Sequence, residues 1–287
     1  MRENKKRKKL LHSATRRIRR DDGSTGRLIG GIIAVVAGIA LTIGLVTGVN
    51  ALQKLWLEQC IIKDVSKQVT IVTGNHVKSG VILDGFGLKE GANLAQIDFK
   101  AKRLELLARV PNIKSLVIAR QLPDRVKITV NEREPVARMG IKGQKNMTGR
   151  VVDADGVVFL RRIGTDMLPI IREPVSSGTM PGRSLSGRTA SALKLVMLSA
   201  DKEFSGLGIL EVDTSPKDYL LAVLGNYQRA KICWDGIDEP TAGTEKNMLS
   251  QLRNLQRAVN SNIASRAILW NATEPGRVTA DTKEPIL

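Results

Sequence analysis

Residues 98–131 read DFKAKRLELLARVPNIKSLVIARQLPDRVKITVN and contain a helical pattern followed by two strand patterns. Asp98 is suited to cap the start of the helix, because its carboxylate can accept hydrogen bonds from free backbone N–H groups of the first turn. Pro111 cannot continue a helix and marks its end. The apolar residues expected to share one face of this helix are Leu104, Leu107 and Val110.

The two strand patterns cover residues 113–119 and 125–131. Only Gln121 to Asp124 separate them, which predicts a tight hairpin with Pro123 in its turn. In the second strand apolar and polar residues alternate with a period of two, as in a strand with one buried face. The predicted buried face consists of Val126, Ile128 and Val130, and the opposite face of Lys127, Thr129 and Asn131.

The pattern extends toward the N-terminus. Residues 67–73 (KQVTIVT) alternate as a strand, and Gly74-Asn75 interrupts it. A short helix with Val77, Val81 and Ile82 is expected to follow. The predicted order of elements in this part of the chain is therefore β-α-α-β-β.

The first 50 residues have the pattern of a membrane anchor. Residues 1–27 contain eleven basic and three acidic side chains, whereas residues 28–49 are 22 uncharged, mostly apolar residues. A helix of that length can cross a bilayer, and the basic arm is expected to stay in the cytoplasm. A cleaved signal peptide is the alternative, since residues 49–51 resemble a cleavage site, but its apolar stretch would usually be about 7–15 residues.

The remaining basic excess does not indicate a nucleic-acid site. Beyond residue 27 there are 34 basic and 25 acidic residues without a block of like charge, and the whole chain has nine aromatic residues. Base stacking depends on aromatic side chains. The run Lys5–Lys9 could also be a nuclear-localisation signal or a nucleic-acid patch, but a basic run before a spanning helix is more often a topology signal.

Residues 138–272 predict a β-rich region with at least two helices. Strand patterns occur at 151–158 around an Asp-Gly turn, at 168–171, and at 208–213, 218–224 and 229–234. Helices are expected near 187–200, with Leu193, Val196 and Met197, and from Thr244 onward. The apolar stripe predicted for the second helix is Met248, Leu252, Leu255 and Val259. Residues 138–150 could be a hinge.

The composition offers little for metal or cofactor chemistry. The chain has two histidines, His12 and His76, and two cysteines, Cys60 and Cys233, with no CxxC motif. We therefore expect no metal and no cofactor. Two free thiols are favoured over a disulfide between these cysteines.

Residues 191–194 match one enzyme motif. Ser191-Ala192-Leu193-Lys194 matches the SxxK of penicillin-binding acyl enzymes, and Lys78-Ser79-Gly80 resembles their third motif. The order of the motifs along the chain is wrong, and no Ser-x-Asn occurs. We therefore expect no enzyme activity.

Residues 74–137 resemble the POTRA domain of the FtsQ/DivIB bacterial cell-division proteins. The residues that carry the resemblance are Pro111, Arg120, Pro123, Glu132 and Pro135. The resemblance implies an α+β protein with a basic cytoplasmic arm (1–27), a transmembrane helix (28–49) and a juxtamembrane linker (50–66). A POTRA domain (67–137), a β domain (138–272) and a C-terminal tail (273–287) follow.

The function implied by the resemblance is that of a non-enzymatic scaffold of the divisome. Such a protein is anchored in the inner membrane with its C-terminal domains outside the cytoplasm, and acts at the septum to control septal peptidoglycan synthesis. Its partners would be small bitopic FtsB- or FtsL-like proteins that add a strand to a sheet edge. The alternative is a POTRA-bearing transport or secretion accessory protein. Residues 267–270 and 277–280 are expected to form a terminal hairpin at the edge of the sheet. The apolar residues expected at the partner edge are Ile268, Leu269, Trp270 and Val278.

Overall fold

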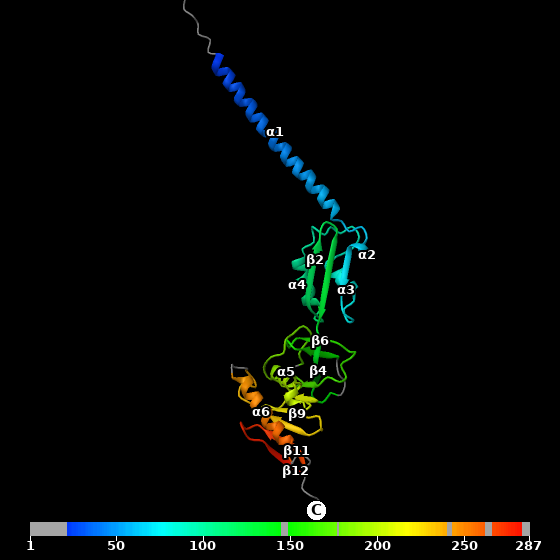
Figure 1. The fold of residues 1–287 in the computed structure, drawn as a ribbon, viewed down its shortest axis with the longest axis vertical. Coiled ribbons are helices and arrows are strands. Elements are labelled where there is room, and N and C mark those ends of the chain that lie inside the picture. Colours follow the sequence, from blue (N-terminus) through cyan, green and yellow to red (C-terminus); the bar gives the residue numbers. More distant parts are fainter. Residues whose placement is uncertain (1–21, 145–148, 177, 240–242, 262–265, 283–287) are drawn as a thin grey trace, which may run out of the picture. The chain divides into compact units, whose positions relative to one another are not determined.

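The computed structural model describes residues 22–144, 149–176, 178–239, 243–261 and 266–282 (Figure 1). The chain divides into two compact units, Met1–Gln59 and Cys60–Leu287, each of which is described by itself. Most of the basic arm, and Lys5–Lys9 within it, lies outside the described residues.

The first unit is built around helix α1, Asp22–Gln59. Its segment Gly31–Gln59 is long and apolar enough to cross a membrane. The helix continues through residues 50–59, where we expected a linker. That stretch, NALQKLWLEQ, consists largely of good helix formers and has no glycine or proline to stop the helix. At 1.5 Å per residue, 38 residues extend about 57 Å, well beyond the hydrocarbon thickness of a bilayer.

The second unit begins with a small α+β fold around a three-stranded sheet of order β1-β3-β2. Strand β3 pairs parallel with β1 and antiparallel with β2. The predicted β-α-α-β-β order is confirmed, with one additional helical turn, α2, before the first strand. The elements are α2 Val65–Gln68, β1 Val69–Val72, α3 Ser79–Phe86, α4 Phe99–Arg109, β2 Ile113–Gln121 and β3 Arg125–Glu132.

Helix capping and the spacing of apolar residues explain most of this fold. The Asp98 carboxylate accepts hydrogen bonds from the backbone N–H groups of Lys100 and Ala101, both at 3.0 Å, and so caps α4 as predicted. The predicted inner face of β3 is buried. The predicted face of α4 is wrong at Leu104, which is 62% exposed. Phe99 and Leu106 are buried instead, because residues seven apart lie on the same side of a helix.

The rest of the second unit is organised by a nine-stranded sheet of order β12-β11-β10-β9-β8-β7-β4-β5-β6. Its strands are β4 Pro135–Ile141, β5 Arg150–Asp153, β6 Val158–Leu160, β7 Ile170–Glu173, β8 Glu211–Asp213, β9 Leu220–Val223, β10 Arg229–Ile232, β11 Ala267–Ala272 and β12 Thr279–Thr282. Its helical elements are α5 Gly187–Ser199, η1 Lys202–Phe204 and α6 Thr244–Val259. The predicted β-rich region with two helices is confirmed.

Two of these strands cross the limits that we expected for the β domain. Strand β4 begins at Pro135 and occupies the start of the segment considered as a hinge. Strand β12 lies in the segment expected to be a tail. Both belong to the sheet because each pairs with a neighbouring strand, β4 with β5 and β7, and β12 with β11.

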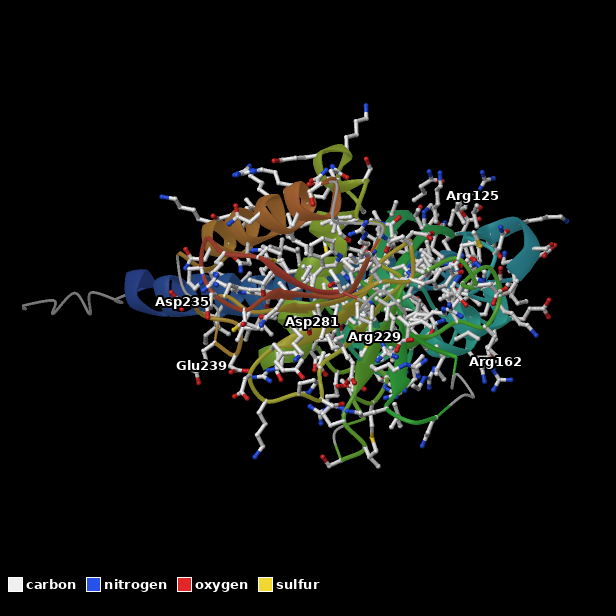
Figure 2. The ribbon with its side chains drawn as sticks, turned by 90° about the horizontal axis from the view of Figure 1, so that it is seen from below. Arg125, Arg162, Arg229, Asp235, Glu239 and Asp281 are labelled. Carbon is white, nitrogen blue, oxygen red and sulfur yellow. The ribbon has the colours of Figure 1, made fainter. Side chains whose placement is uncertain are left out.

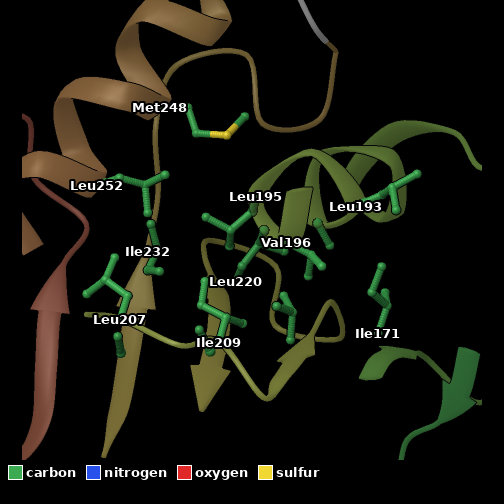
Figure 3. Close-up of a cluster of buried hydrophobic side chains, with 14 of the residues drawn as sticks. Ile171, Leu193, Leu195, Val196, Leu207, Ile209, Leu220, Ile232, Met248 and Leu252 are labelled. Carbon is green, nitrogen blue, oxygen red and sulfur yellow. The ribbon is translucent and has the colours of Figure 1, made fainter. Parts of the chain in front are cut away.

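Charged and apolar side chains are separated as expected for a folded unit in water. Figure 2 shows Arg125, Arg162 and Glu239 extending away from the ribbon, and all three are exposed. Beneath this surface, helices α5 and α6 contribute side chains to a continuous core with β7, β9 and β10 (Figure 3). The α6 residues Met248, Leu252 and Leu255 are fully buried, which confirms the predicted stripe as core, whereas Met197 of α5 is exposed.

Candidate functional site

The nine-stranded sheet has two edge strands, β6 and β12, and they differ in how they are covered. At β6, Val158 donates a backbone hydrogen bond to Arg183 (2.9 Å) and accepts one from Gly182 (2.7 Å). An isolated bridge also joins Val157 to Ser184. The loop before α5 therefore protects this edge.

Strand β12 forms the other edge. It pairs antiparallel with β11, and within the described parts of the chain no strand pairs with its outer side. Thr279, Asp281 and Thr282 are exposed. An edge of this kind presents unpaired backbone N–H and C=O groups that another chain can use.

The sheet register places the side chains near this edge in rows. Arg229 of β10 lies opposite Leu269 of β11, which lies opposite Asp281 of β12. This row faces outward, with Arg229 and Asp281 exposed (Figure 2). The neighbouring row, Ala230, Trp270 and Ala280, faces the core.

The structure distributes the four residues predicted for the partner edge over different environments. Ile268 is 45% exposed and Leu269 is half-buried. Trp270 is 2% exposed, and its indole Nε1 donates a hydrogen bond to Gln228 Oε1 at 2.8 Å. Val278 packs against the core just before β12.

Three of these residues lie on β11, which is not an edge strand, because β10 covers its other side. The parallel pairing of β10 with β11, across the intervening helix α6, produces this order. The order of the strands along the chain does not reveal that β11 has a neighbour on both sides. The open edge is therefore β12, the second strand of the predicted terminal hairpin, which Val278 directly precedes.

Glu132 is the POTRA-motif residue with the clearest structural role. Its carboxylate accepts hydrogen bonds from the backbone N–H groups of Val77 (2.8 Å) and His76 (3.2 Å), and lies 3.4 Å from Thr73 Oγ1. The carboxylate thereby fixes the loop between β1 and α3. A Cβ atom added at Gly74 would lie 2.7 Å from Glu132 Cδ, so a side chain at this position would force the carboxylate to move.

The other motif residues lie at separate places in the fold. The Arg120 guanidinium lies over the ring of Phe99, 5.6 Å from its centroid. Pro123 is in the hairpin turn between β2 and β3, and Pro135 begins β4. Pro111 follows α4 closely, and its carbonyl accepts a hydrogen bond from Arg133 Nε at 3.0 Å. The motif residues therefore support the fold at several points and do not form one pocket.

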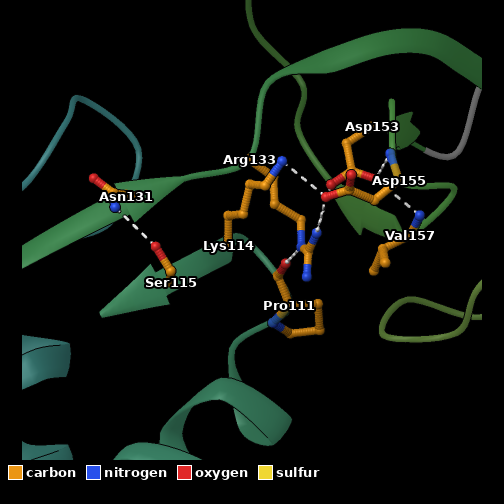
Figure 4. A network of polar contacts seen from close by, with 8 residues as sticks. All are labelled: Pro111, Lys114, Ser115, Asn131, Arg133, Asp153, Asp155 and Val157. Carbon is orange, nitrogen blue, oxygen red and sulfur yellow. Dashed lines mark hydrogen bonds and ion pairs between the residues drawn. The ribbon is translucent and has the colours of Figure 1, made fainter. Parts of the chain in front are cut away.

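Arg133 also joins the small α+β fold to the nine-stranded sheet (Figure 4). It donates from Nη1 to Asp153 Oδ2, and the other oxygen of Asp153 accepts from the backbone N–H groups of Asp155 (3.1 Å) and Val157 (2.9 Å). Lys114 adds an ion pair to Asp155 at 2.8 Å. The hydrogen bond from Lys114 lowers the pKa of the Asp155 carboxyl below its ordinary value. We call these contacts of Lys114, Arg133, Asp153 and Asp155 the polar seam.

The residues of the SxxK match have structural contacts. Ser191 is buried and its hydroxyl donates to the carbonyl oxygen of Ile237 at 2.6 Å. Lys194 points elsewhere and forms an ion pair with Glu245 at 2.6 Å. The pair therefore lacks the geometry of a serine nucleophile activated by a lysine.

The metal-ligating residue types are dispersed in the part of the chain that the structure describes, which contains no group of three or more of them placed to hold an ion. Cys60 and Cys233 are free thiols. Burial raises the pKa of the Cys233 thiol, which disfavours its reactive thiolate form.

Comparison with known proteins adds a family match. Residues 66–133 match the family model described as POTRA domain, FtsQ-type. Three curated relatives are each named "Cell division protein FtsQ". Those of Neisseria meningitidis serogroup B and Neisseria gonorrhoeae are 30% identical over 168 residues, which is 56% of this chain and 61% and 59% of the relatives. That of Koribacter versatilis is 29% identical over 160 residues, 53% of this chain and 43% of the relative. The matches thus span about half the length of these relatives.

Proposed function

Because the chain belongs to the FtsQ family of cell-division proteins, we propose that it is a non-enzymatic scaffold that recruits and links division proteins at the septum. In this role it controls septal peptidoglycan synthesis through binding. Helix α1 is the membrane anchor, with the basic arm in the cytoplasm and the unit Cys60–Leu287 outside it.

The observation that carries the binding proposal is the difference between the two edges of the large sheet. Loop residues cover β6, whereas the outer side of β12 has no strand partner among the described residues. A segment of a small bitopic FtsB- or FtsL-like protein adds to β12 as a further strand. Its backbone hydrogen bonds supply affinity, and its alternate side chains supply specificity.

The register also constrains the partner's side chains. A residue placed opposite Asp281 extends the outward row of Arg229, Leu269 and Asp281. A basic side chain is favoured there, because opposite charges directly across two strands stabilise a sheet by about 0.2–1 kcal/mol. A residue opposite Ala280 continues the core row, where an apolar side chain fits.

The division role is tested by the location of the full chain in living cells. A fluorescent fusion is expected to form a band at midcell in dividing cells. The matched control is a fusion that carries residues 1–59 alone, which is expected to spread around the envelope. An even envelope distribution of the full chain throughout the division cycle would contradict the proposal and would favour a transport or secretion role.

A further inference from the structure

A cavity of about 430 Å³ lies beside β4, β5 and the loop that follows β6. This volume is within the range of about 300–1,000 Å³ usual for small-ligand sites. Four arginines line the cavity together with one threonine and one aspartate: Arg138, Arg150, Arg161, Arg162, Thr165 and Asp166.

The nearby carboxylates do not balance these arginines. Arg150 pairs with buried Glu173 at 3.2 Å, and Arg161 Nη1 pairs with exposed Glu134 at 3.2 Å. With Asp166, three carboxylates accompany four guanidinium groups, so the site keeps a net positive charge. Within the described residues Arg138 and Arg162 have no ion pair.

The arginines also retain donors for a ligand. Arg138 uses Nε for the carbonyl oxygen of Leu168 (3.1 Å), which leaves its two terminal nitrogens available. The Nε of Arg161 is closed off from solvent and is therefore not counted among these donors.

We propose that this cavity binds a phosphate-bearing anion, with a diphosphate as the ligand group. The lining arginines come from three segments of the chain, namely β4, β5 and the loop after β6. A tetrahedral phosphate accepts hydrogen bonds from several directions, whereas a planar carboxylate is satisfied by one arginine fork. A diphosphate also matches a net positive site better than a single carboxylate does.

The diphosphate has two possible sources, a soluble compound or a prenyl-linked lipid carrier. The loop that provides Arg161 and Arg162 also contains Ile163 and Met167, which are 79% and 97% exposed. Apolar side chains this exposed can contact a hydrocarbon chain attached to the phosphate. The two sources share the same recognition chemistry, and a direct comparison of probes separates them.

The test is isothermal titration calorimetry on the full chain purified in detergent, at constant ionic strength. The probes are inorganic pyrophosphate, geranyl diphosphate and glutamate. Arg162→Gln keeps most of the aliphatic stem and is expected to weaken pyrophosphate binding about tenfold, the loss of one charge-assisted contact. Arg138→Lys keeps the charge but loses the fork, and is expected to weaken binding as well.

Arg229→Ala is the matched control, because Arg229 is exposed on the same unit but does not line the cavity (Figure 2). Its affinity for pyrophosphate should equal that of the parent. Tighter binding of geranyl diphosphate would identify a lipid-linked ligand, and equal binding a soluble one. Absence of pyrophosphate binding, equal affinity for glutamate, or an equal loss in Arg229→Ala would overturn the proposal.

Discussion

Glu132 illustrates how one side chain can fix a loop. The backbone N–H groups of His76 and Val77 precede α3 and have no partner within that helix, so they need an acceptor. The Glu132 carboxylate supplies it from the end of β3. Gly74 permits this approach because it has no side chain, and its backbone φ lies outside the left-handed region.

We predict that Gly74→Ala displaces the Glu132 carboxylate and lowers the free energy of unfolding by about 1.5–3 kcal/mol, the usual contribution of hydrogen bonds to a charged group. Denaturant unfolding of the full chain in detergent measures it. The same substitution in a Glu132→Ala background should cost much less, since no carboxylate remains to be displaced. Equal costs in both backgrounds would show that the two residues do not interact.

At the scale of the element, β3 is the central strand of the small sheet, and one of its faces is inside the core. Ile128 is fully buried, whereas its neighbour Thr129 is on the opposite face. We predict that Ile128→Asp lowers the free energy of unfolding by several kcal/mol, because it buries a charge without a partner. Thr129→Asp is the matched control, and similar melting temperatures for the two variants would contradict the assigned faces.

The elements show what a sequence can and cannot reveal. The alternation in β3, the Asp98 cap and the stripe of α6 depend on neighbours along the chain, and the sequence predicted all three. Leu104 was misassigned because several apolar residues of α4 compete for one face. The terminal hairpin at the sheet edge was also predicted, but not that its first strand, β11, pairs parallel with β10.

The candidate sites depend even more on contacts between distant residues. Asp153 precedes an Asp-Gly turn in the sequence, but nothing local shows that it receives Arg133 from another sheet. The adjacent pair Arg161-Arg162 was a signal for the cavity that the sequence analysis missed. The pair indicates a cavity only in combination with Arg138, which is distant in the sequence and lines the same cavity in the folded chain.

At the scale of the whole molecule, the polar seam holds two sheets of the second unit together. The side chains of Asp153 and Asp155 differ sharply in exposure, 4% and 52%, although they belong to the same turn. We predict that Asp153→Ala lowers the free energy of unfolding by about 3–5 kcal/mol, because the Arg133 charge and two backbone N–H groups lose their acceptor.

Asp155→Ala is the control for this prediction. It removes the exposed pair with Lys114 and the longer contact of the Asp155 carboxylate with Arg133 Nη1 at 3.7 Å, but leaves the short contact of Arg133 with Asp153 in place. Exposed ion pairs contribute little to stability. Its melting temperature in detergent should stay close to that of the parent chain. Equal destabilisation by the two substitutions would show that the buried contact of Arg133 with Asp153 contributes no more to stability than the exposed contacts of Asp155.

Among the described strands, β12 is the free edge of the large sheet. Ala280 and Asp281 are adjacent in this strand, so one directs its backbone N–H toward β11 and the other directs it outward. Proline removes the N–H at either position. One proline variant therefore removes a hydrogen bond within the sheet, and the other removes a donor that a partner strand would use.

The direct measurement compares Ala280→Pro and Asp281→Pro in co-purification of the co-expressed FtsB- and FtsL-like proteins with the full chain. We expect one variant to lose these partners while its melting temperature stays close to that of the parent. The other should melt at a lower temperature, because it loses a hydrogen bond to β11. Retention of the partners by both variants at parental levels would contradict strand addition at β12.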